Sequence, residues 1–117
     1  MRTILLCVPI KKDKIADFKT FVKELLGFKK KDYKELHVRY GITNTRIWMH
    51  TLNDKSYILF THDLSDDLET HMRKFANSKH PFDLWFAEQL EGFYNIEDVD
   101  AMSAQPPEFI GEFNLQK

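Results

Sequence analysis

The stretch Thr45–Leu64, "TRIWMHTLNDKSYILFTHDL", decides the fold that this chain is expected to adopt. Two runs rich in β-branched and aromatic residues, "TRIWMHTL" and "SYILFTHDL", are separated by Asn53, Asp54 and Lys55, which favour a tight turn. The stretch therefore predicts a β-hairpin. Pairing of Leu52 with Lys55 across the turn then assigns every residue of the hairpin to one of its two faces.

The two faces of this hairpin differ in composition. One face carries apolar side chains suited to packing beneath helices, namely Ile47, Met49, Ile58 and Phe60. The opposite face mixes aromatic and ionisable groups, and its members are Arg46, Trp48, His50, Tyr57, Leu59, Thr61 and Asp63. This mixture is too apolar for open solvent and too polar for a dry core. We expect the second face to meet a partner or to line a pocket.

The residues before the hairpin predict one strand and two helices. Thr3–Val8 carries aliphatic side chains on both alternating faces, as a central strand covered on both sides does. A helical pattern follows, with Asp13 as its N-cap and Gly27 as a left-handed stop. A second helix starts at about Lys29 and ends at Gly41.

The residues after the hairpin predict two more helices and a last strand. Asp66 begins a capping-box pattern, and Pro81 stands at the first position of the next helix, where proline is best tolerated. The polar composition between Asn95 and Pro107 predicts an ordered loop. The run "EFIGEFNL", Glu108–Leu115, predicts the final strand.

When each pair of consecutive helices is counted as one helical region, the coarse order is strand, helix, strand, strand, helix, strand. This is the ferredoxin-like βαββαβ arrangement, a four-stranded antiparallel sheet with helices on one face. We therefore expect a single α+β domain over residues 1–117. In such a domain the other face of the sheet stays uncovered, which agrees with the mixed face of the hairpin.

The order of elements, the long helical region before the hairpin and the block "HPFDLWF" (His80–Phe86) resemble the dimeric α+β barrel superfamily, in particular a bacterial family of unassigned function within it. The resemblance implies a homodimer in which two ferredoxin-like sheets face each other. It also implies ligands between sheet and helices or inside the barrel. The superfamily includes cofactor-free monooxygenases, sugar mutarotases, isomerases and haem-degrading enzymes, so the fold implies no single reaction.

Four residues of the mixed face form the leading candidate for a ligand-binding site: Arg46, Trp48, His50 and Tyr57. Alternating positions on paired strands bring an anion contact, a stacking platform and a base onto one surface. The alternative is a dimer interface made of the same aromatic and polar contacts. Asp63 either pairs with Arg46 or ends the strand as a solvated group.

His80 is the fifth candidate, and it has two interpretations. An imidazole titrates near neutral pH, which suits a general acid or base at the mouth of a pocket. A residue before proline is also steered to the extended geometry of a helix N-cap, and we favour this structural role.

The other histidines and the only cysteine predict no metal site. His37 and His71 fall on or near buried helical stripes, and His62 faces the helices. None of the spacings HxH, HxxxH or HExxH occurs. Because Cys7 is the only cysteine, no internal disulfide forms, which fits a reducing cytoplasm, and no zinc-binding cysteine pair exists.

Composition excludes several classes of partner. The 17 basic and 18 acidic residues nearly cancel, so no one-signed field would gather nucleic acid or an anionic membrane. No apolar run approaches the roughly 20 residues of a membrane helix. No glycine-rich phosphate loop or other motif predicts a cofactor.

Together these features lead us to expect a small-molecule-binding protein or a cofactor-independent enzyme of the dimeric α+β barrel kind. One alternative is a non-catalytic assembly or regulatory module that uses the sheet face only for dimerisation. A further alternative is a haem-binding or haem-degrading protein, which rests on aromatic residues and histidines within this fold.

Overall fold

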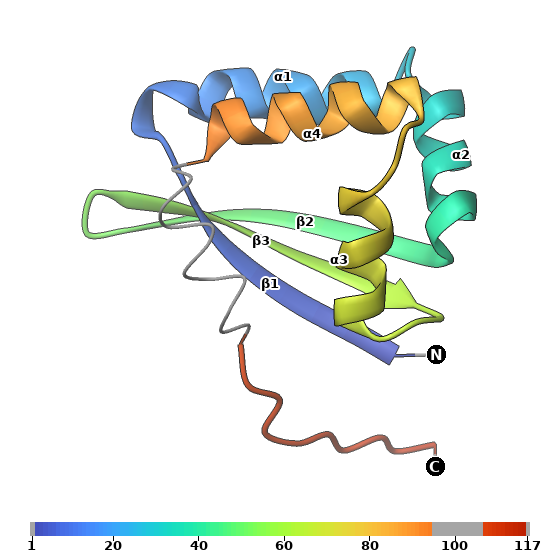
Figure 1. Cartoon of the computed structure of the whole chain (residues 1–117). Helices are drawn as coiled ribbons and strands as arrows, with labels where there is room; N and C mark the ends of the chain where they lie inside the picture. Colours follow the sequence, from blue (N-terminus) through green and yellow to red (C-terminus); the bar gives the residue numbers. More distant parts are fainter. Residues whose placement is uncertain (1, 95–106, 117) are drawn as a thin grey trace.

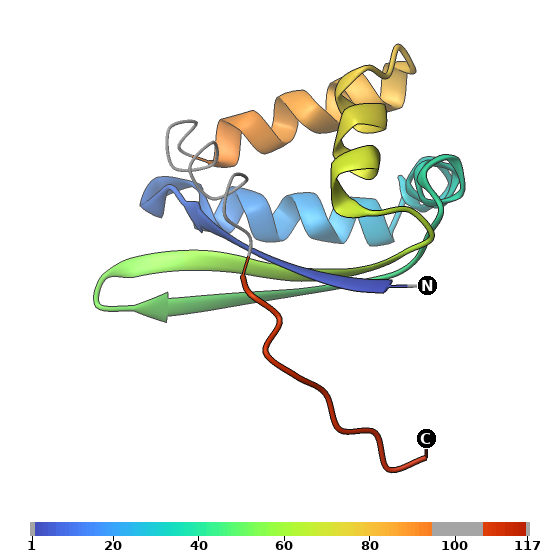
Figure 2. The same ribbon diagram turned by 60° about the horizontal axis from the view of Figure 1, so that its bottom comes forward.

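The computed structural model describes residues 2–94 and 107–116 and has an α+β architecture, as predicted (Figure 1). Along the described chain its strands and α-helices are β1 (Arg2–Ile10), α1 (Ile15–Leu26), α2 (Lys30–Tyr40), β2 (Ile42–Leu52), β3 (Lys55–Leu64), α3 (Leu68–Ala76) and α4 (Pro81–Phe93). One 3₁₀ turn, Lys12–Lys14, precedes α1. The helices lie together on one side of the sheet (Figures 1 and 2).

The sheet is antiparallel with the order β1-β3-β2. Leu52 pairs with Lys55, which confirms the predicted hairpin register. Asn53 and Asp54 both adopt positive φ, 50° and 66°, as the central residues of a two-residue hairpin turn do. Because β3 is the central strand, the prediction of Thr3–Val8 as a central strand covered on both faces is wrong for the described residues. β1 lies at an edge.

The fourth strand predicted at Glu108–Leu115 is not formed. Residues 107–116 contain no strand pairing and are exposed along their whole length. They leave the body on the side of the sheet opposite the helices (Figures 1 and 2). A strand forms only by pairing with a neighbouring strand, and residues 107–116 do not pair with either edge strand, β1 or β2, of their own chain. The sheet of the described residues is therefore three-stranded, and the predicted loop before Pro107 lies outside them.

An aromatic core joins α1 to α4. The ring of Phe21 lies 5.2 Å from that of Phe93, 5.6 Å from Phe86 and 5.7 Å from Trp85, between centroids. Beneath the helices, Leu25, Ile58 and Leu64 of α1 and β3 are fully buried. Burial of apolar surface of this kind is the main favourable term in folding.

The ends of α1 and α2 follow the predicted signals only in part. Gly41 ends α2 with φ 66°, as predicted. Gly27 has φ −109°, so its predicted left-handed conformation is wrong. A Cβ at Gly27 would lie 2.9 Å from the carbonyl oxygen of Lys23, which explains the absence of a side chain there. Asp13 lies inside the 3₁₀ turn and does not cap α1.

The N-cap of α3 is displaced by one residue from the prediction. The carboxylate of Asp67, not of Asp66, accepts a hydrogen bond from the backbone N–H of Thr70 at 2.7 Å. Asp66 instead forms an ion pair with Lys74 at 2.7 Å. Two adjacent aspartates offer the same capping chemistry, and the alternative partner of Asp66 decides between them.

Candidate functional site

The sheet has one face that no described helix covers, and we call it the open sheet face. Its register-defined members are Thr3, Leu5, Cys7, Pro9, Asn44, Arg46, Trp48, His50, Leu52, Lys55, Tyr57, Leu59, Thr61 and Asp63. The opposite face packs against the helices through Val8, Ile10 and Ile58. The structure therefore brings four of the predicted site residues onto one surface, namely Arg46, Trp48, His50 and Tyr57.

An apolar strip crosses the centre of the open sheet face. Cys7, Leu59 and Trp48 lie side by side on β1, β3 and β2. Trp48 is 51% exposed and Leu5, two residues before Cys7, is 41% exposed. An indole that is half in water on a strand surface loses the contacts that a tryptophan normally makes. The strip is therefore the part of this face that would gain most from being covered.

Ionisable groups lie on either side of this strip. Arg46 and His50 are two residues before and after Trp48 on β2, and both are exposed. Tyr57 lies directly opposite His50. Asp63 accepts a hydrogen bond from the hydroxyl of Thr3, and no ion pair joins it to Arg46. Arg46 thus has no carboxylate partner among the residues that the structure describes.

A groove of about 350 Å³ lies elsewhere, between α1 and α4. Its lining is largely charged and polar and consists of Lys14, Asp17, Thr20, Phe21, Glu24, Glu88, Gln89, Gly92 and Phe93. None of the predicted site residues lines it. The groove and the open sheet face are therefore separate features of the described residues.

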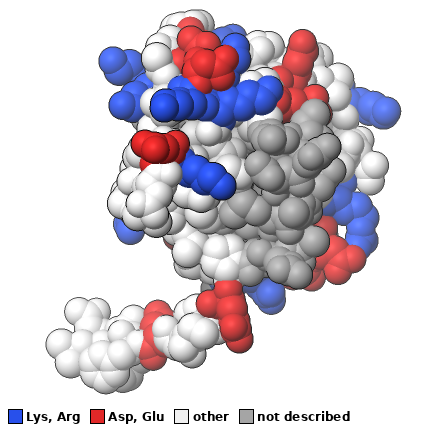
Figure 3. Space-filling model, turned by 90° about the vertical axis from the view of Figure 1, so that its left-hand side faces the viewer, with Lys and Arg blue, Asp and Glu red and all other residues white. Residues whose placement is uncertain are grey.

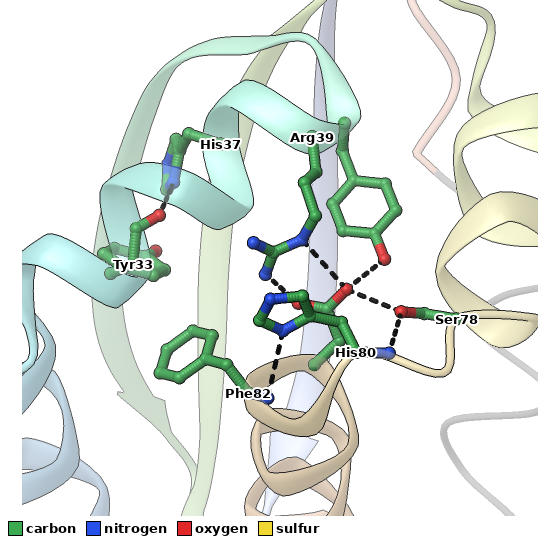
Figure 4. Close-up of polar contacts among 8 residues, drawn as sticks. Tyr33, His37, Arg39, Ser78, His80 and Phe82 are labelled. Carbon is green, nitrogen blue, oxygen red and sulfur yellow. Dashed lines mark hydrogen bonds and ion pairs between the residues drawn. The ribbon is translucent and has the colours of Figure 1, made fainter.

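His80 lies apart from the other four predicted residues, at the start of α4 (Figure 4). Its Nδ1 accepts a hydrogen bond from the backbone N–H of Phe82 at 3.2 Å, and Pro81 occupies the first helical turn. The backbone N–H of His80 donates to the hydroxyl of Ser78 at 3.1 Å. The preferred N-cap role is therefore confirmed, and His80 does not join the open sheet face.

Next to this cap lies a buried carboxylate that the sequence analysis did not single out. Asp83 is 1% exposed and accepts hydrogen bonds from Arg39, Tyr40 and Ser78. Burial opposes its ionisation, but the bonds from these three donors outweigh burial and hold the pKa of Asp83 below its usual value. Figure 4 shows Arg39 of α2 reaching toward the start of α4. The arrangement fastens α2 to α4 and leaves the carboxylate fully occupied by its own chain.

A second polar cluster lies between α2 and the helix-facing side of the sheet, and we call His37, Thr45 and His62 the histidine chain. The carbonyl oxygen of Tyr33 accepts a hydrogen bond from His37 Nδ1 at 2.8 Å (Figure 4). Since Nδ1 carries the proton of that bond, His37 Nε2 can accept from the hydroxyl of Thr45 at 2.8 Å, and Thr45 Oγ1 can then accept from His62 Nδ1 at 2.8 Å. One backbone carbonyl thus sets the tautomer of both imidazoles.

A third histidine lies beside this chain. The ring centroid of His71 on α3 is 6.0 Å from that of His62, and its buried Nδ1 has no hydrogen-bond partner among residues 2–94 and 107–116. Burial first, and then the neighbouring His71 and His37, lower the pKa of His62 from 6.5 to about 4. Burial also lowers the pKa of His71. Both imidazoles are therefore neutral at neutral pH.

The sequence analysis did not predict the histidine chain, because it assigned a position to each histidine separately. The signal was present, since the register that pairs Leu52 with Lys55 also places Thr45 opposite His62. His37 was already expected on a buried stripe, but only the packing of α2 on β2 shows that it reaches Thr45. No group of three or more potential metal ligands occurs among the described residues.

No family model, curated protein or solved structure matches this chain. Across the described helices, none combines the length and the apolar character needed to cross a membrane. The resemblance to the dimeric α+β barrel superfamily therefore stays a prediction, and function has to be argued from the geometry.

Proposed function

We propose that this protein is a homodimeric small-molecule-binding protein of the dimeric α+β barrel kind, in which two open sheet faces meet and enclose the ligand. One observation carries the proposal: half-exposed Trp48 lies between two ionisable residues, Arg46 and His50, on a sheet face that the described helices leave uncovered. A surface of this composition combines an apolar contact area with groups that orient a ligand.

The apolar strip supports association of two copies. Trp48, Leu5 and their neighbours expose apolar area whose transfer from water is favourable by about 25 cal/mol per Å². An isologous dimer covers the same strip on both copies at once. The described helices lie on the far side of each sheet and do not cover this face (Figure 2).

The spacing along β2 supports a planar aromatic anion as ligand. Side chains two residues apart on a strand are separated by about 7 Å. A flat ring stacked on Trp48 would therefore place an acidic substituent within reach of Arg46. His50 and Tyr57, which face each other across the strands, would contact the opposite end of the ligand.

Light scattering at micromolar concentration tests the dimer, and fluorescence tests the ligand. In a Trp85→Phe background, Trp48 is the only tryptophan of the chain. We expect benzoate to change its emission saturably and the neutral benzyl alcohol to do so at least about tenfold less effectively.

Two arginine variants localise that effect. Arg46→Met should weaken benzoate binding about tenfold or more, since it removes the cation next to Trp48 on the same face of β2. Arg73→Met removes an exposed arginine of α3 and should leave binding unchanged. Equal effects of the two substitutions, or a monomer at all concentrations, would contradict the proposed site.

A non-catalytic assembly module is the second candidate function. It is favoured by the position of the groove in the described residues, which lies between α1 and α4 and is not lined by His50. In that case the two faces would fill each other. A stable dimer whose Trp48 emission does not change with any aromatic anion tested would support the assembly module instead of the small-molecule-binding protein.

A further inference from the structure

We propose that residues 107–116 of one copy form the fourth strand of the sheet of a second copy, by pairing with the outer edge of its β1. We call these residues the C-terminal segment. The inference rests on the homodimer proposed above but goes beyond it, because it assigns a strand exchange that the contact between open sheet faces does not require.

The outer edge of β1 is not built as an exposed edge. In the described residues β1 pairs only with β3, apart from one bridge at its end. Edge strands normally carry charged residues that prevent pairing with other chains. From Thr3 to Ile10, β1 contains no charged residue, whereas the other edge strand, β2, carries Arg46. Apart from Pro9, which is typical of edge strands, the composition of β1 from Thr3 onward is that of an interior strand, and interior strands have a neighbour on each side.

The backbone of β1 is already aligned to accept such a neighbour. At its end the N–H of Lys11 donates to the carbonyl of Phe93 at 3.0 Å, and Ile10 bridges Tyr94. Backbone groups alternate in direction along a strand, so the N–H groups of Cys7, Leu5 and Thr3 point to this same edge. Pro9 lies at the position between Lys11 and Cys7 in this series. It has no N–H, so it offers no hydrogen-bond donor to a neighbour at this edge.

The C-terminal segment has the pattern of a strand with one apolar face. Phe109, Phe113 and Leu115 stand at alternate positions, with Gly111 between the phenylalanines, and the other face carries Glu108, Glu112 and Asn114 together with one apolar residue, Ile110. Phe109 is 78% exposed, Phe113 87% and Leu115 86%. In Figure 3 this segment stands away from the body as white surface interrupted by acidic residues. A large apolar surface fully in water marks a segment that is completed by a partner.

The direction of the C-terminal segment identifies the partner as a second copy. The segment extends beyond its own sheet on the side of the open sheet face (Figures 1 and 2). In the proposed homodimer that side is where the second copy lies. With two-fold symmetry, each copy contributes its C-terminal segment to the other copy and receives one in return. The outer edge of β1 is then paired in both copies.

The double variant Phe109→Ser/Phe113→Ser tests the role of the apolar face. We expect the dimer dissociation constant to rise about 100-fold, measured by light scattering and sedimentation over a concentration series. Phe28→Ser is the matched control, since Phe28 is also 78% exposed but lies between α1 and α2, and its dissociation constant should not change. An unchanged constant for the double variant would overturn strand exchange while leaving the homodimer standing.

Cross-linking through Cys7 tests whether the exchange is between copies. One variant keeps Cys7, and a second carries Cys7→Ser with Gly111→Cys, a position where a Cβ meets nothing within 4 Å. A short bismaleimide added to their mixture can join Cys7 to position 111 only between chains. We expect a covalent dimer that contains one chain of each variant, and we expect it in the mixture only, not in either variant alone. If instead only a chain with Cys7 and Gly111→Cys together cross-links, as a monomer, the segment folds onto its own β1 and the inference is wrong.

Discussion

At the scale of single residues, Asp83 is the most heavily bonded side chain in the described structure, and its loss should be costly. Asp83→Ala leaves Arg39, Tyr40 and Ser78 without their shared acceptor. Removing one member of a buried ion pair costs about 3–5 kcal/mol, and we expect a loss in this range by urea unfolding. Glu69→Ala breaks the exposed pair with Arg73 and should cost under about 1 kcal/mol. Equal losses would show that Asp83 is not the clamp between α2 and α4.

His62 should make folding stability depend on pH. Because its pKa falls from 6.5 in the unfolded chain to about 4 in the fold, the unfolded state binds the proton first. Stability is therefore fully present above pH 6.5 and declines as the pH falls toward 4, by up to about 3 kcal/mol for this group. Burial lowers the pKa of His71 too, which adds a loss of the same sign.

Urea unfolding of the native chain and of His62→Gln across this pH range measures the contribution of His62. The substitution should flatten the decline between pH 6.5 and 4. A His62→Gln protein with the full native decline would assign the pH dependence to other groups.

At the scale of elements, the sequence predicted positions better than it predicted ends. The hairpin register followed from alternation and a two-residue turn, both of which are local properties. The N-cap of α3 was assigned one residue early, because Asp66 and Asp67 are equally suited to capping until the position of Lys74 is known. The last strand failed for a different reason, since strand pairing depends on a neighbour outside the segment.

Any side chain at Gly41, at the junction of α2 and β2, should lower the free energy of unfolding. Its φ of 66° disfavours other residues, and a Cβ would lie 2.2 Å from the hydroxyl oxygen of Ser65. We expect Gly41→Ala to cost about 1–3 kcal/mol by thermal or urea unfolding. Gly92→Ala is the control in α4, where a Cβ meets nothing within 4 Å, and it should be neutral or stabilising by up to about 1 kcal/mol. Similar losses for both would mean that the junction rearranges to accept the methyl group.

At the scale of the whole molecule, sequence periodicity could predict which residues share a face but not what covers that face. The grouping of Arg46, Trp48, His50 and Tyr57 followed from the period of two in a strand. The histidine chain required the angle at which α2 packs on the sheet, which periodicity does not contain. The wrong prediction of β1 as an interior strand has a physical explanation: its composition is suited to a sheet with one more strand than the described chain supplies.

Hydrogen exchange of β1 amides should report the completed sheet. If the C-terminal segment of a second copy pairs with β1, the N–H groups of Thr3, Leu5 and Cys7 are bonded only in the dimer. We expect these three amides to exchange at least about tenfold more slowly at a concentration where the dimer forms than after dilution to the monomer. Phe109→Ser/Phe113→Ser should remove that difference, whereas the amides of β3, bonded on both sides within one chain, should stay protected in every sample. Fast exchange of the β1 amides in a confirmed dimer would place the C-terminal segment somewhere other than on this edge.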